Sequence, residues 1–185
     1  IARDSHARVA CETFAANDKI IVAGEFRTAR RDDFEAVRAA APAIVRDVLR
    51  QIGYGTAEHD IDPDACEIEV RFNHQSPEIQ AGVDGGETTG AGDQGLMFGH
   101  AVDETEALMP LAWSLATDLV QRASSLIVAG GGILKPDGKA QVTVRYANGI
   151  AVGIDTVVLS WQHRPNIRLA EVRDYLSSEV LDQVI

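Results

Sequence analysis

Alternating apolar and polar positions predict two β-hairpins, one near each end of the chain. Residues 8–16 alternate, and residues 19–27 are rich in Ile and Val, with Asn17-Asp18 between them as a two-residue turn. Residues 140–163 hold a second pair of alternating runs around Asn148-Gly149, a dipeptide that suits the two positive φ angles of a type I′ turn. Residues 66–73 alternate again and predict a further strand.

Apolar residues at helical spacing predict helices between and after these strands. We expect a short helix or turn near 32–40 and a separate helix over about 42–52, because Pro42 suits the first turn of a helix better than its interior. The second helix is expected to bury one apolar face, formed by Ile44, Val45, Val48, Leu49 and Ile52.

Two further stretches have a helical pattern. Residues 104–128 are helical in pattern with an interruption at Pro110, and the glycines at 130–132 end the pattern. Residues 168–183 predict a terminal amphipathic helix with Leu169, Val172, Leu176 and Val180 on one side.

Residues 76–92 combine Pro77 with many glycines and few large apolar groups, which predicts a long loop. Loops of this length inside compact domains usually carry function, and we expect this one to close over an active site. The recurring unit of hairpin plus helix indicates an α+β fold with helices on one face of antiparallel sheets. We expect a first α+β repeat over 1–73, the mobile active-site loop over 74–92, and a second repeat over 93–185.

Composition narrows the classes of partner and location. The 185 residues carry a formal net charge of −11, which argues against a nucleic-acid partner because no basic stripe is available to neutralise phosphates. No apolar run is long enough to span a membrane, and no secretory signal is present, so we expect a cytoplasmic protein with no membrane partner. Two cysteines give neither a disulfide framework nor zinc spacing. The missing initiator Met predicts a trimmed or partial chain.

Gly90, Gly92 and Gly95 in "GAGDQGLMFGHA" satisfy the spacing G-x-G-x-x-G of dinucleotide-binding loops. That fingerprint requires a strand before it and a helix after it, with an acidic residue about 20 positions further on. A glycine-rich loop precedes these glycines instead, and no Gly-Lys-Ser/Thr of a phosphate-binding P-loop occurs anywhere. The spacing is therefore a coincidence.

The segment "GAGDQGLMFGHAVDETEALMP" at 90–110 resembles the signature of the S-adenosylmethionine synthetases, also called methionine adenosyltransferases. Other stretches resemble the same family in the same order: "RVACET" and "VAGEF" within 8–26, "QSPEIQAGVD" at 75–84, "PDGKAQVTVRY" at 136–146 and "VVLSWQH" at 157–163. The resemblance implies the synthetase fold, in which similar α+β repeats surround a pseudo-threefold axis. The fold is incomplete here, because the chain covers about half of a family member.

The resemblance also implies an activity. Family enzymes join ATP and L-methionine into S-adenosylmethionine and release phosphate and pyrophosphate, with Mg²⁺ and K⁺ as cofactors. They form homodimers or tetramers with active sites between subunits. A "GHPDK"-type segment, which in the family provides a histidine near the triphosphate and an aspartate for Mg²⁺, would precede residue 1, and a glycine-rich phosphate-binding segment would follow Ile185.

Three residues match positions that bind methionine in the family. Asp93 is expected to bind the ammonium group and to be the catalytic aspartate, since an ammonium needs a fixed anion and burial strengthens such a pair. Glu25 is expected to contact methionine, and the Gln75 amide to donate to its carboxylate. The alternative for Asp93 is a turn made through its own backbone, and for Glu25 a solvated carboxylate at a strand end.

Three more residues match the family's ATP and potassium positions. Asp137 and Lys139 in "PDGK" match the ATP site, with a polar turn as the alternative reading. Glu12 matches a glutamate that helps to hold K⁺, with an exposed strand position as its alternative. His74 and His163 are expected to be structural, because displacement at C5′ by a thioether needs no proton transfer. Met97, Phe98 and Met109 are expected in the core.

Three hypotheses for function remain at this point. The chain is part of an active synthetase, or a truncated and inactive piece that keeps the methionine pocket, or a non-catalytic partner subunit that regulates a full-length synthetase.

Overall fold

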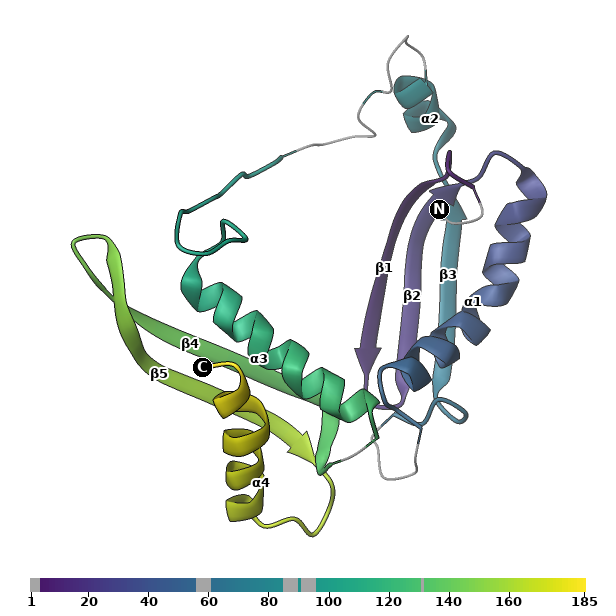
Figure 1. The fold of residues 1–185 in the computed structure, drawn as a ribbon. Coiled ribbons are helices and arrows are strands. Elements are labelled where there is room, and N and C mark those ends of the chain that lie inside the picture. Colours follow the sequence, from purple (N-terminus) through teal and green to yellow (C-terminus); the bar gives the residue numbers. More distant parts are fainter. Residues whose placement is uncertain (1–3, 56–60, 85–89, 91–95, 131) are drawn as a thin grey trace. The chain divides into compact units, whose positions relative to one another are not determined.

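The computed structural model describes residues 4–55, 61–84, 90, 96–130 and 132–185. The chain divides into two compact units, which are treated separately below. The first unit comprises residues 1–48 and 60–98, and the second comprises residues 49–59 and 99–185. Both units combine small sheets with helices, so the predicted α+β class is confirmed (Figure 1).

The first unit is built on a three-stranded sheet in the order β1-β2-β3. Strands β1 (Arg8–Ala16) and β2 (Lys19–Arg27) form the predicted antiparallel hairpin, with Asn17 at a φ of 51° in its turn. Strand β3 (Glu67–His74) pairs with β2 in parallel, so the expectation of purely antiparallel sheets was wrong. The helix between β2 and β3 returns the chain to the starting end of β2, and this crossover makes a parallel pair possible.

Helix α1 (Arg31–Gln51) is continuous, so the predicted break between 32–40 and 42–52 was wrong. Pro42 lies inside the helix, where it removes one backbone hydrogen bond and bends the axis, and Figure 1 shows α1 changing direction along its length. Buried Phe34 and Ala41 precede the proline or adjoin it, and buried Leu49 follows it. Packing on both sides of Pro42 therefore offsets its local cost.

The buried stripe of α1 also differs from the predicted one. Of the five residues expected on one buried face, Leu49 is buried, but Ile44, Val48 and Ile52 are about half exposed. Phe34, Ala41 and Leu49 are the buried apolar residues of α1, and they repeat every seven or eight residues. Ile44 and Val48 lie at the edge of this stripe, and Ile52 follows the last helical residue.

The predicted loop over 76–92 contains helix α2 (Pro77–Asp84), so the loop prediction was wrong over these residues. Proline is well suited to a first helical position, the Gln80 amide donates to the Ser76 carbonyl, and Glu78 places a negative charge in the first turn. Residues 85–89 and 91–95 lie outside the described residues, and the expected closure of this segment stays a prediction.

The second unit is built on a two-stranded antiparallel sheet of β4 (Leu134–Ala147) and β5 (Ile150–His163). Its turn has φ angles of 52° at Asn148 and 79° at Gly149, which confirms the predicted type I′ hairpin. Helix α3 (Leu111–Val128) begins directly after Pro110, so residues 104–110 are not helical as the pattern suggested. The predicted terminal helix consists of α4 (Leu169–Tyr175), a π-helical turn η1 (Leu176–Val180) and a 3-10 turn η2 (Leu181–Gln183).

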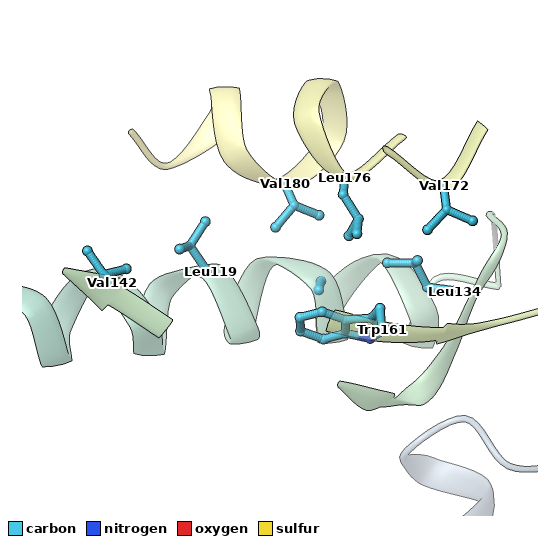
Figure 2. Close-up of a cluster of buried hydrophobic side chains, with 8 residues drawn as sticks. Leu119, Leu134, Val142, Trp161, Val172, Leu176 and Val180 are labelled. Atoms are coloured by element: carbon cyan, nitrogen blue, oxygen red, sulfur yellow. The ribbon is translucent and has the colours of Figure 1, made fainter. Parts of the chain in front are cut away.

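The core of the second unit lies between α3, the terminal helix and one face of the hairpin (Figure 2). Leu119 and Val180 are fully buried within it, and Trp161 is 8% exposed. Leu169, which was expected to share the buried face of the terminal helix, is 62% exposed because it is the first helical residue. The remaining buried members of this core are Ala123, Leu134, Val142, Val172 and Leu176.

Several other sequence expectations can be compared with the structure. Cys66 is buried, Cys11 is half-buried, and both thiols are free. Met97 and Phe98 are at least 90% exposed, so their placement in the core was wrong; they lie in a segment that is neither helix nor strand. No helix among the described residues combines the length and the apolar composition needed to cross a membrane.

Candidate functional site

The parallel pairing of β2 and β3 brings Glu25 and Gln75 to one edge of the first sheet. Phe26 on β2 pairs with His74, the last residue of β3. Glu25 directly precedes Phe26, and Gln75 directly follows His74. The carboxyl ends of parallel strands meet at the same edge of a sheet, where α/β folds commonly bind ligands. Two residues that are 50 positions apart in the sequence are thereby neighbours in one unit.

Glu25 and Gln75 line a pocket of about 350 Å³, together with Arg8 and Ala10 from β1. The Gln75 side-chain oxygen is buried and has no hydrogen-bond partner among the described residues. A buried polar atom without a partner costs free energy, so such an atom beside a pocket indicates a ligand that completes its hydrogen bonds. A carboxylate, a carboxamide and a guanidinium around one small pocket suit a ligand that carries both an ammonium and a carboxylate.

Gly24 fixes the backbone that carries Glu25. Its φ is 143°, a region that L-residues rarely adopt, and a Cβ at this position would overlap the Ala10 carbonyl on the neighbouring strand. The Cys11 thiol donates to the Glu25 carbonyl at 3.8 Å. Burial, and secondarily the charge of Glu12, raises the pKa of the Cys11 thiol, so this group is protonated at neutral pH and acts as a structural donor.

Glu12 lies on the same face of the sheet as Glu25. Glu12 pairs with Ala23, and Glu25 pairs with Ala10, so the two glutamates are diagonal neighbours across β1 and β2. Diagonal neighbours in an antiparallel pair are roughly 7–8 Å apart. The Glu12 side chain is exposed, and no group of three His, Cys, Asp or Glu residues within the described ranges could hold a metal ion. The binding of Mg²⁺ and the binding of potassium at Glu12 both stay predictions.

The opposite face of the sheet carries a column of aromatic rings. Phe72 packs edge-on against Phe26 with ring centroids 5.2 Å apart, Phe26 stacks on Phe34 at 4.4 Å, and Phe34 stacks on His74 at 3.7 Å. This stacking supports the expectation that His74 is structural. The same imidazole also lines a second cavity of about 510 Å³, with His6 and Arg27.

Asp137 and Lys139, the expected ATP residues, lie on β4 in the second unit. Both are exposed, and they alternate with Gly138 and Ala140, which are half-buried. Asp137 lies within an irregularity in the strand pairing between Leu134 and Gly138, and Lys139 follows it. The structure places these two residues on one face of the hairpin. Asp93, expected to bind methionine, lies outside the described residues.

Arg8 is the pocket residue that sequence reasoning missed. It begins β1, and its strand partner is Arg27. The signal was available in the alternation of "RVACET", because Arg8, Ala10 and Glu12 must share one face of a strand. The side chain was overlooked because a single arginine at the start of a strand is usually solvated.

Both units are of the α+β class, and the first unit places a carboxylate, a carboxamide and a guanidinium around one small pocket. The N-terminal domain model of the S-adenosylmethionine synthetases matches residues 1–77, and the central domain model matches residues 88–185. An S-adenosylmethionine synthase of Sulfurovum sp. (strain NBC37-1) is 43% identical over 188 residues, which cover 100% of this chain and 47% of the relative. The chain belongs to the S-adenosylmethionine synthetase family, and it spans about half the length of the curated relative it matches.

Proposed function

We propose that these residues belong to a methionine adenosyltransferase that makes S-adenosylmethionine from ATP and L-methionine. The observation that carries the proposal is the pocket between Glu25 and Gln75, with its buried and unpartnered carboxamide oxygen. The family match supplies the reaction, and the pocket offers groups complementary to both ends of an amino acid. A cytoplasmic location is part of this proposal and rests on the family match alone.

Methionine binding follows from the chemistry of the pocket side chains. The Glu25 carboxylate, with Asp93, receives the ammonium group through charge-assisted hydrogen bonds. The Gln75 carboxamide can accept from the ammonium through its oxygen, and a half-turn about its last bond lets its NH₂ group donate to the methionine carboxylate instead. Arg8 adds positive charge on that side of the pocket. In either orientation, bound methionine gives the buried Gln75 carboxamide a hydrogen-bond partner.

In the reaction, the proposed role of these residues is to position the two substrates. A lone pair of the methionine sulfur forms a bond to C5′ of ATP, and the bond between C5′ and its oxygen breaks with its electrons retained by the triphosphate. Water then cleaves the triphosphate to pyrophosphate and phosphate. Asp137 and Lys139 are proposed to contact ATP, with Lys139 offsetting phosphate charge. Mg²⁺ would neutralise the triphosphate, and K⁺ would take Glu12 as one oxygen ligand.

We also propose that the protein assembles from like subunits. Phe14 on β1 is 65% exposed, and α1 covers one face of the first sheet only. The uncovered face carries Phe14 together with the charged Glu12 and Glu25, so this proposal rests on the exposed Phe14 ring and on the family match rather than on an apolar sheet face. Sedimentation velocity is expected to show a dimer or larger species; a monomer with a single cooperative thermal transition contradicts this.

Calorimetric titration of L-methionine tests the pocket directly. Glu25→Gln keeps the shape of the side chain but removes its charge, and we expect it to weaken methionine binding about 10- to 100-fold. Glu78→Gln, an exposed change in α2 of the same unit, is the matched control and is expected to leave binding unchanged. Equal affinities for the unaltered protein and Glu25→Gln contradict the proposed role.

A coupled assay of phosphate and S-adenosylmethionine release separates the remaining functions. Product formation by the 185-residue chain supports an active synthetase. Methionine binding without product indicates an inactive piece. Restored or altered turnover on mixing with a full-length family member indicates a regulatory subunit. The last two outcomes contradict a self-sufficient enzyme.

A further inference from the structure

Gly138 and Trp161 form a cross-strand pair in the hairpin of the second unit. The two residues lie directly opposite each other on β4 and β5, and the indole ring covers the glycine. A Cβ at Gly138 would overlap the ring carbons Cε2 and Cδ2 of Trp161. Gly138 does not have a positive φ, so a left-handed backbone is not what calls for glycine at this position. The ring alone requires glycine here.

Trp161 is held in place by the core. It is 8% exposed and packs among the buried side chains of α3 and the terminal helix, as Figure 2 shows. Its indole nitrogen is buried and has no hydrogen-bond partner among the described residues. An unpaired buried N–H destabilises a protein, so the value of this tryptophan lies in its packing rather than in a hydrogen bond. An aromatic ring laid over a strand glycine compensates for the missing side chain.

The pair lies where an irregular part of the hairpin becomes regular. Leu134 pairs with His163 and Gly138 with Trp161, so four steps along β4 face two steps along β5. From Gly138 to Thr143 the pairing then proceeds one residue at a time, with Lys139 opposite Ser160. Bulges of this kind redirect side chains near functional sites. The Gly138–Trp161 contact therefore fixes the first regular position after the bulge.

Asp137 and Lys139 flank this fixed position. Side chains alternate along a strand, so both point away from the face on which Trp161 covers Gly138, and both are exposed. Any displacement of Gly138 from the ring moves both flanking residues together. We propose that Trp161 is a positioning residue that, through Gly138, sets the placement of Asp137 and Lys139 toward ATP. This inference rests on the ATP role proposed above for these two residues.

The test uses the full natural chain that carries residues 1–185, with MgATP and L-methionine as calorimetric probes. Gly138→Ala is expected to raise the dissociation constant for MgATP about 10- to 100-fold, because a misplacement of about 1 Å has effects of this size. The dissociation constant for L-methionine is expected to stay within about twofold, since Glu25 and Gln75 belong to the first unit. Gly153→Ala on β5 is the matched control, because its Cβ would meet only the flexible end of Arg145, at 3.4 Å.

A double variant isolates the contact. Gly138→Ala combined with Trp161→Val removes the ring that the new methyl group overlaps, so it is expected to recover part of the affinity lost in Gly138→Ala, to the roughly tenfold loss expected when the ring is missing. If Trp161 had a purely structural role, the double variant would bind MgATP more weakly than Gly138→Ala alone. Unchanged MgATP binding in Gly138→Ala, equal losses for both ligands, or no recovery in the double variant overturns the inference.

A second pair of variants decides the question if Gly138→Ala does not fold. Trp161→Phe keeps a ring over Gly138 and is expected to retain MgATP binding within about threefold, whereas Trp161→Ala is expected to weaken it about tenfold. Equal binding in these two variants overturns the inference. Lys139→Ala separates it from the proposed function: if Lys139→Ala binds MgATP normally, or if the unaltered protein does not bind it, the ATP role itself fails. If Lys139→Ala weakens binding and Gly138→Ala does not, the positioning role alone fails.

Discussion

The two units place their candidate binding residues differently relative to their cores. In the first unit, Glu25 and Gln75 lie at the carboxyl ends of a parallel strand pair, around a pocket in which one polar atom is already buried. In the second unit, Asp137 and Lys139 lie on the exposed face of a hairpin whose other face carries the core. The first site is a preformed pocket, and the second is a surface whose geometry is set by packing behind it.

Because of this difference, the two candidate sites should respond to different kinds of substitution. The proposed methionine binding in the first unit should depend on the backbone path at Gly24, because the register of β1, β2 and β3 creates the pocket. The proposed ATP binding in the second unit should depend on side-chain volume in the core, because Trp161 packs behind β4. Core substitutions in the second unit should therefore affect stability and ATP together, and backbone substitutions in the first should affect methionine.

Leu119→Ala is expected to have the largest effect. Leu119 is fully buried at the centre of the second core, so the substitution leaves a cavity and should lower the free energy of unfolding by about 3–5 kcal/mol. Leu169→Ala, the same change at a 62% exposed position, is the control and should cost at most about 0.5 kcal/mol. Urea denaturation measures both, and similar losses in the two variants would contradict the placement of the core.

Gly24→Ala tests the first unit in the same way. The methyl group would overlap the Ala10 carbonyl at a φ that alanine rarely adopts, and we expect a loss of about 2–3 kcal/mol in unfolding free energy. Methionine binding should weaken as well, because Glu25 adjoins the displaced residue. Gly82→Ala in α2 has no atom within 4 Å of its new methyl group and should be neutral or stabilising by about 0.5–1 kcal/mol. Equal stability of both variants would contradict the strained backbone at Gly24.

Local signals in the sequence were sufficient to predict the two hairpins and to identify the family. Asn148-Gly149 combines two residues that tolerate positive φ angles, and the strands on both sides alternate, so turn and register follow from neighbouring residues alone. The terminal helix likewise follows from Val172, Leu176 and Val180, which are all buried as their spacing predicted. Such elements depend on interactions within a few residues of one another.

Features that depend on distant residues were predicted less well. The parallel pairing of β3 with β2 depends on the path of α1, and no local pattern in residues 66–73 distinguishes it from antiparallel pairing. The uninterrupted course of α1 depends on packing around Phe34 and Leu49, which overrides the local preference of Pro42. The candidate site divides in the same way. The resemblance identified Glu25 and Gln75, and local alternation puts Arg8 on the face of Ala10 and Glu12, but only the pairing of the strands brings Arg8 to the same pocket as Gln75.

The turns of the two hairpins provide a smaller test. Gly149 has a φ of 79° and open space around it, so Gly149→Ala changes only the backbone energy and should cost about 1–2 kcal/mol. Asn17 in the first hairpin has a φ of 51°, and Asn17→Ala should cost about 1 kcal/mol, since asparagine tolerates this region only moderately better than alanine. Thermal melts of the two variants measure both costs, and no loss in either would contradict the assigned turn conformations.

The smallest expected effect concerns pH and one carboxylate in each unit. In the second unit, Glu104 accepts from the Leu111 amide at 2.9 Å and from the Tyr146 hydroxyl at 2.7 Å, and these bonds hold the pKa of Glu104 below its ordinary value. In the first unit, Asp4 accepts from the amides of Ala29 and His6, and these bonds hold the pKa of Asp4 below its ordinary value. A carboxyl with a lowered folded-state pKa stabilises the fold above its unfolded pKa, and this contribution is lost as the pH falls through the folded pKa.

Because Glu104 accepts from Tyr146, we also expect a loss of folding stability at high pH, which is not expected for Asp4. The bond with Glu104 raises the pKa of the Tyr146 hydroxyl, so the contribution of this hydroxyl is present below the ordinary pKa of tyrosine and is lost as the pH rises through the raised value. Melting temperatures of the unaltered protein, Glu104→Gln and Asp4→Asn are to be compared from about pH 3 to pH 11, a range that spans the ordinary carboxyl and tyrosine values. The difference between the unaltered protein and Glu104→Gln should shrink at both extremes, and that for Asp4→Asn only at the acid extreme. A Glu104→Gln difference that is constant across this range would mean that Glu104 supports the start of α3 through shape and not through its charge.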